Sequence, residues 1–162
     1  MFVLAPTLVD DVWRELVSSS PTVVGSLVER FRREQPVLAG FVRAAEEGVF
    51  ADDERGSLMF YSLWSWLVCQ RAGRAAREIT EEVIEAALSE NSRLLHSAAT
   101  APPSDVMSTA SAWTATYPAL PLLSGILNQV MGGELENTRR VDDFAGLITL
   151  YMKTVIDCLM RE

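Results

Sequence analysis

The chain has 162 residues, of which 49% are hydrophobic and 22% charged, and its formal net charge is -8 at pH 7. This length and composition predict one globular domain over residues 1–162 with a sizeable core, and they exclude general disorder. The negative charge would repel a phosphate backbone, so nucleic acid is not expected as a partner.

Targeting and membrane signals are not found in the sequence. The start of the chain has no basic residue ahead of its short apolar run, unlike a secretory signal. The longest nearly unbroken apolar run, Leu58 to Cys69, is shorter than the roughly 20 residues that a membrane helix needs. Cys69 and Cys158 stand in apolar stretches without metal or redox spacing. These features predict a cytoplasmic protein with buried thiols and no membrane insertion.

Capping residues divide the chain into about eight predicted helices, and no stretch alternates in the way that predicts a strand. The first helix follows Pro6 and Thr7 and ends at residues 18–20. Ser20 then caps a second helix that has Pro21 as its first residue and runs to about Glu34. We therefore expect an all-α fold.

The next two predicted helices form the middle of the chain. Pro36 opens the third helix, which Gly48 ends. Asp52 is predicted to cap the fourth helix, which ends near Arg71. Apolar side chains cover every face of this fourth helix, and that profile predicts burial on several sides.

The remaining predicted helices also begin at capping or first-turn residues. The sixth is expected to end before Pro118 and the seventh at Gly132. The fifth to eighth helices are predicted to start at Thr80, Ser104, Pro121 and Asp142, respectively.

Two stretches of the chain, residues 21–71 and 103–161, share a pattern over three predicted helices. The motif DDxxGxxxxY occurs in both, and its matched residues are Asp52, Asp53, Gly56 and Tyr61 in the first stretch and Asp142, Asp143, Gly146 and Tyr151 in the second. The alternative explanation is that residues typical of helix starts and ends recur in both stretches for local reasons, without duplication. Duplication predicts two related helical halves, packed through the fourth and eighth helices.

The segment from Asn91 to Gly133 carries only two formally charged residues, Arg93 and Asp105. A solvated helix normally carries more charge. The segment is therefore buried core, a covered interface or the lining of a pocket, and the sequence leaves these three open. Together with a mean hydropathy of +0.14, it favours self-association.

No catalytic or nucleotide-binding motif occurs in the sequence. His96 is the only histidine, expected to be partly buried, and GxSxG, HExxH, GxGxxG and P-loop patterns are not found. Helix capping explains the aspartate pairs 52–53 and 142–143, although converging pairs could hold a divalent metal. The sequence favours a protein without catalysis, metal or cofactor, and a metal-assisted enzyme using these aspartates is the weakest alternative.

The leading functional hypothesis is a helical protein–protein interaction or adaptor domain that self-associates. The alternative is a module that binds a small apolar ligand between the two halves, in contact with aromatic side chains. Core packing is the competing explanation for aromatic residues on an apolar helix. The predicted ligand-binding residues are Tyr61, Trp64, Trp113 and Tyr151.

Overall fold

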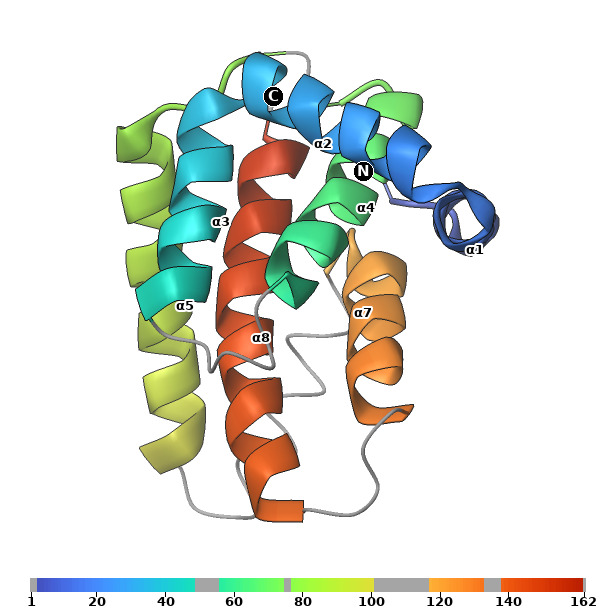
Figure 1. Ribbon diagram of the computed structural model, residues 1–162. Coiled ribbons are helices and arrows are strands. Elements are labelled where there is room, and N and C mark those ends of the chain that lie inside the picture. Colours follow the sequence, from blue (N-terminus) through green and yellow to red (C-terminus); the bar gives the residue numbers. More distant parts are fainter. Residues whose placement is uncertain (1–2, 49–55, 75–76, 101–116, 133–137, 162) are drawn as a thin grey trace.

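The computed structural model describes residues 3–48, 56–74, 77–100, 117–132 and 138–161, which form seven helices and no strand. The predicted all-α fold class is confirmed for this part of the chain. The sixth helix predicted after Ser104 lies outside the described residues. In chain order the helices are α1 (Pro6–Ser18), α2 (Pro21–Glu34), α3 (Pro36–Gly48), α4 (Ser57–Arg71), α5 (Glu81–Thr100), α7 (Leu120–Gly132) and α8 (Thr138–Met160) (Figure 1).

The second and third helices begin where the sequence predicts, because their start signals are local, whereas α1 begins at Pro6, ahead of the start predicted after Pro6 and Thr7. Proline is the first residue of α1, α2 and α3, a position where its missing N–H costs no hydrogen bond. Ser20 caps α2, since its Oγ accepts a hydrogen bond of 3.3 Å from the backbone N–H of Val23. Gln35 alone separates α2 from α3.

The fourth helix begins at Ser57, so the prediction that Asp52 caps it is wrong; Asp52 itself lies outside the described residues. Gly56 precedes the helix with a φ of 93°, a left-handed conformation that cannot continue a right-handed helix. The carboxylate of Glu46 on α3 caps α4 instead, accepting a hydrogen bond of 2.6 Å from the backbone N–H of Met59.

The last helix also begins at a different residue from the one predicted. It starts at Thr138, so Asp142 stands inside α8 and the predicted start is wrong. No glycine or proline lies between these two positions, and therefore nothing in this stretch prevents the helix from starting earlier.

Helix α8 is the centre of the bundle, with α4, α5 and α7 packed around it (Figure 1). Helix α4 lies directly against α8, where Ser62 Oγ donates a weak hydrogen bond to Met152 Sδ at 3.7 Å. The fourth and last helices thus pack together, as expected from their apolar sequences. Among the α8 side chains that the structure describes, the buried hydrophobic ones are Ile148, Met152, Val155, Ile156, Cys158 and Leu159.

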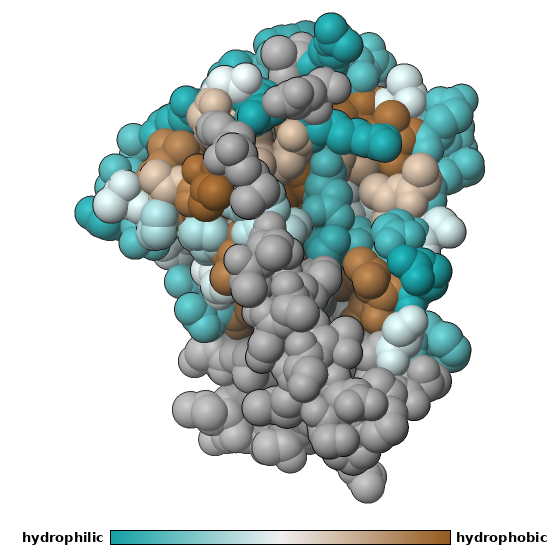
Figure 2. Space-filling model, turned by 180° about the vertical axis from the view of Figure 1, so that it is seen from behind, coloured by the Kyte–Doolittle hydropathy of each residue, from teal (hydrophilic) through white to brown (hydrophobic). Residues whose placement is uncertain are grey.

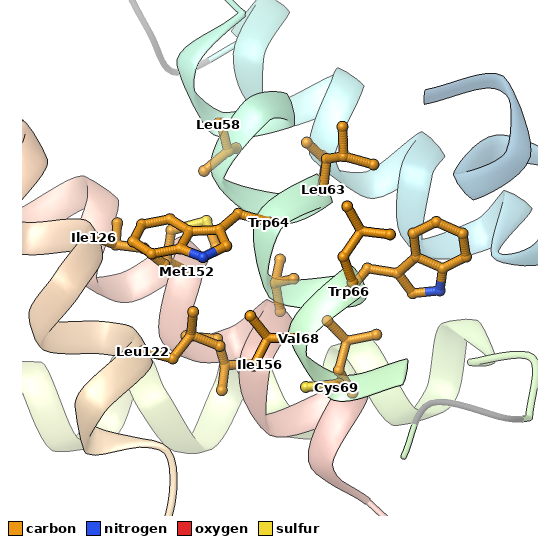
Figure 3. Close-up of a cluster of buried hydrophobic side chains, with 14 of the residues drawn as sticks. Leu58, Leu63, Trp64, Trp66, Val68, Cys69, Leu122, Ile126, Met152 and Ile156 are labelled. Carbon is orange, nitrogen blue, oxygen red and sulfur yellow. The ribbon is translucent and has the colours of Figure 1, made fainter. Parts of the chain in front are cut away.

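Two tryptophans point to opposite sides of α4 (Figure 3). The indole N–H of Trp64 donates a hydrogen bond of 3.0 Å to the backbone carbonyl of Val9 on α1. Trp66 stacks on Phe31 of α2, with 5.3 Å between the ring centroids. Helix α4 is therefore buried on several sides, which confirms the prediction from its uniformly apolar sequence.

Helix α7 belongs to the core, and this explains part of the charge-poor segment 91–133. Leu122, Leu123 and Ile126 are at most 1% exposed. A Cβ atom added at Gly125 would lie 3.0 Å from the ring of Trp64, so the glycine allows α7 to approach α4 closely. The low charge of α7 reflects burial within the chain and gives no support to an interface there.

The arrangement does not show the internal repeat. Gly56 precedes α4 with positive φ, whereas its aligned counterpart Gly146 lies inside α8. The two aligned segments therefore begin their helices at different places. Residues 103–116 of the second segment lie outside the described residues, and the two related halves stay a prediction.

The described surface carries few large hydrophobic side chains that are well exposed. These are Val3, Val17, Val23 and Val37. On the face seen in Figure 2, hydrophobic residues reach the surface in separate groups bordered by hydrophilic ones. No helix in the described ranges is long and apolar enough to cross a membrane.

Candidate functional site

An open groove of about 420 Å³ runs between α3 and α5, which lie side by side at one edge of the bundle (Figure 1). We call it the α3–α5 groove. Its lining combines apolar side chains from both helices with two carboxylates from α5. The lining residues are Val37, Phe41, Glu81, Ile84, Glu85 and Leu88.

The apolar walls of the α3–α5 groove come from matching positions on the two helices. Val37 and Phe41 stand one turn apart on α3, and Ile84 and Leu88 stand one turn apart on α5. Phe41 is held in place by Tyr151 of α8, with 5.7 Å between the ring centroids. Ile84 is 4% exposed and Val37 is 37% exposed, so the groove reaches from the core to the surface.

The charged residues that line the α3–α5 groove are all acidic and all come from α5. Glu81 and Glu85 line it from α5, and none of the lining residues is basic. Neither carboxylate has an ion-pair partner within the described part of the chain, and Arg43 of α3, which does not line the groove, pairs with Glu47 at 3.2 Å. The groove therefore offers an apolar surface with a negative edge along α5.

A second hollow, of about 590 Å³, lies between α2, α3 and the start of α4. Its basic residues Arg32 and Arg43 pair with Glu29 and Glu47 of their own helices, at 3.1 and 3.2 Å. Its Glu46 caps α4. Because these charged groups already have partners of opposite charge or polarity, this hollow carries no clear preference for a ligand.

A cluster of polar side chains joins α5, α8 and the segment before α7. Lys153 Nζ donates hydrogen bonds of 2.7 Å to both Asn91 Oδ1 and Asp157 Oδ2. Tyr117 donates to the other oxygen of Asp157 at 2.8 Å, and Asn91 also donates to Thr154 at 3.2 Å. Buried polar groups that satisfy one another in this way fix how the helices meet.

The side chains of this cluster stabilise the packing of the helices. The side chain of Lys153 is only 11% exposed, and its ammonium lies 5.0 Å from the centre of the Tyr117 ring. Burial and the neighbouring carboxylate of Asp157 raise the pKa of Tyr117 far above its usual value, so the phenol keeps its proton and remains a donor. The sequence analysis missed this cluster; its one local signal is the pair Lys153 and Asp157, one turn apart on an otherwise apolar helix face.

Neither hollow described above is lined by Tyr61, Trp64 or Tyr151, the predicted ligand-binding aromatics that the structure describes. Trp64 is 2% exposed and hydrogen-bonded to α1, so core packing accounts for it. Tyr151 lies against Phe41 on the α3 side of α8. Half-buried Tyr61 shares α4 with Trp64, and burial raises the pKa of its phenol. Trp113 lies outside the described residues, and ligand binding by these residues stays a prediction.

The acidic pairs and the histidine form no recognisable metal centre in the described ranges, where no three His, Cys, Asp or Glu side chains gather in a group. Asp52 and Asp53 lie outside these ranges, and Asp142 and Asp143 stand within α8. His96 is exposed on α5, which corrects the expectation that it is partly buried, since it points away from the core face of that helix.

The two cysteines are free and buried, as the sequence predicts. Burial raises the pKa of both the Cys69 and the Cys158 thiol to about 12. A thiol nucleophile reacts as the thiolate, which requires a lowered pKa. Neither cysteine therefore has the electrostatic environment of a reactive nucleophile.

Comparison of the chain with protein-family models, curated proteins and solved structures finds no match. The class of protein is therefore defined by the fold and the surface alone. It is an all-α helical bundle with an apolar, acidic-edged groove between two of its helices.

Proposed function

We propose that this chain is a helical protein-interaction domain that binds a helix of a partner protein in the α3–α5 groove. The observation that carries the proposal is the pair of apolar ridges, Val37 with Phe41 and Ile84 with Leu88, which leave a channel between two helices. An amphipathic helix lays its apolar face into such a groove through residues spaced i, i+3, i+4 and i+7.

The apolar ridges favour a helix over an extended strand as the occupant. Helix α3 and helix α5 each contribute side chains one turn apart, and a third helix has the same repeat along its own face. The described residues contain no strand and hence no sheet edge to which an extended segment could add. The groove volume of about 420 Å³ also falls within the range of small-ligand pockets, but the groove is open along one side, whereas such pockets usually enclose their ligand.

The occupant is a different protein rather than a second copy of this chain. In a two-fold symmetric contact, the same patch on both copies would meet itself. Glu81 and Glu85 of one copy would then lie close to those of the other, at a cost from like-charge repulsion. Self-association of the domain stays a separate prediction, and the burial of α7 removes part of its support.

The proposal is tested by titrating isotope-labelled protein with a designed helical peptide of about four turns that has leucines at i, i+3, i+4 and i+7 and glutamines elsewhere. We expect chemical-shift changes around Val37, Phe41 and Leu88, and we expect Val37→Asp to weaken binding. Val17→Asp changes a more exposed valine on α1, 55% exposed against 37% for Val37, and should leave binding intact.

Absence of binding, or shift changes centred on another surface, would overturn the proposal. Binding of a small apolar probe such as toluene in the same groove, without binding of the peptide, would instead favour the ligand module.

A further inference from the structure

The acidic edge of the α3–α5 groove contains one carboxylate that helix stability does not explain. Glu81 and Glu82 stand in the first turn of α5, where negative charge complements the positive end of the helix dipole. Glu85 lies one turn further, beyond the range where the dipole favours an acid. It nevertheless lines the groove beside Glu81, in a like-charge i, i+4 pair that slightly destabilises a helix.

Several basic residues of the chain already have acidic partners on their own helices. Arg30 pairs with Glu34 at 2.6 Å, and on α5 itself Arg93 pairs with Glu90 at 2.7 Å. No described basic side chain pairs with Glu81 or Glu85. These two carboxylates are therefore available to a cation from outside the chain.

We infer that the partner helix is basic along one edge, with Lys or Arg side chains one turn apart facing Glu81 and Glu85. This inference rests on the proposed function, because it names the chemistry of the occupant of the same groove. The opposite wall, formed by Val37 and Phe41, contributes no charge to the groove. The partner helix is therefore basic on the α5 side and uncharged on the α3 side, and this asymmetry sets how the helix is rotated in the groove.

Three versions of the designed peptide test the inference. They share the leucine face and carry either two lysines one turn apart along one edge, two glutamates there, or the original glutamines. We expect the lysine peptide to bind about fivefold or more tightly than the glutamine peptide, and the glutamate peptide to bind weakest. Raising NaCl from about 0.05 to 0.5 M should weaken binding of the lysine peptide and leave the glutamine peptide nearly unchanged.

A double variant, Glu81→Gln with Glu85→Gln, tests whether these two carboxylates cause the preference for the lysine peptide. It should remove the preference for the lysine peptide while keeping the binding of the glutamine peptide. Glu82→Gln is the matched control, since Glu82 stands in the same turn of α5 but does not line the groove. The control should change the affinity for the lysine peptide less than twofold.

The outcomes separate the two proposals. Equal binding of the lysine and glutamine peptides would contradict the inference of a basic partner, while the proposal of an interaction groove would stand. A preference that survives the double variant would also overturn the inference, because the cations would then be bound elsewhere. If none of the three peptides binds, the proposal of an interaction groove and the inference of a basic partner are both contradicted.

Discussion

At the scale of single residues, two buried tryptophans on α4 differ in one respect. Trp64 donates its indole N–H to the carbonyl of Val9, whereas the indole N–H of Trp66 has no hydrogen-bond partner among the described residues. Trp66 is instead held by its ring faces, stacked on Phe31 and lying 5.0 Å from the guanidinium of Arg30. A buried donor without a partner costs free energy, so Trp66 contributes through packing alone.

This difference predicts that Trp64→Phe destabilises the domain more than Trp66→Phe does. Both changes remove similar volume from a buried site and keep an aromatic ring. Only Trp64→Phe also removes a hydrogen bond, which adds about 1 kcal/mol to the loss in free energy of unfolding. Urea denaturation of both variants beside the unmodified protein measures the difference. A loss for Trp66→Phe equal to or larger than that for Trp64→Phe would contradict this account.

At the scale of helices, the sequence correctly predicted the helix starts that depend only on residues close by in the chain. Ser20 and Pro21 act within one turn of each other, and the start of α2 was therefore predicted correctly. The start of α4 depends on Glu46 from another helix and on the left-handed φ of Gly56, and neither can be recognised from a run of apolar residues. The helical class was accessible from the sequence, whereas helix starts set by tertiary contacts were not.

The candidate site was even less accessible from the sequence. Val37 and Phe41 lie far along the chain from Ile84 and Leu88, and only the packing of α3 beside α5 brings the four together. The i, i+4 spacing within each pair is equally typical of a core face. The sequence therefore gave no reason to distinguish an open groove from buried packing at these positions.

The polar cluster of α5 and α8 leads to a second prediction, at the helix scale. Lys153→Met would leave Asp157 without its buried cation, and we expect a loss of about 2 kcal/mol in unfolding free energy. This is less than the roughly 3–5 kcal/mol of a fully buried pair, because the side chain of Asp157 is 28% exposed. Denaturant unfolding measures the loss.

An exposed pair on α5 provides the control for this prediction. Arg93→Met removes the cation from Glu90, but both side chains are more than half exposed, so no measurable change is expected. If Lys153→Met were as neutral as Arg93→Met, the cluster would not hold α5 against α8.

At the scale of the whole molecule, the helices that the sequence predicted to contact other molecules are buried in the core instead. Helices α4, α7 and α8 contribute most of the buried hydrophobic side chains in the described part of the chain, and α4 and α7 both pack against α8. Outward-facing apolar surface remains on α3 and α5, beside the carboxylates of α5. The functional hypothesis therefore moves from the charge-poor segment to a groove between two amphipathic helices.

The placement of α7 yields the final prediction, which separates core from interface. Leu122 is fully buried, so Leu122→Glu would place an unpaired carboxylate in the core. We expect a loss of more than about 4 kcal/mol, a large part of the 5–15 kcal/mol that stabilises a typical domain. Circular dichroism should show lost helicity, and light scattering should show no folded monomer released from an assembly. Gln129→Glu adds the same charge at an exposed position of α7 and should change neither measurement. A helical, monomeric Leu122→Glu variant of a protein that is otherwise dimeric would contradict the core position of α7 and identify its face as the interface.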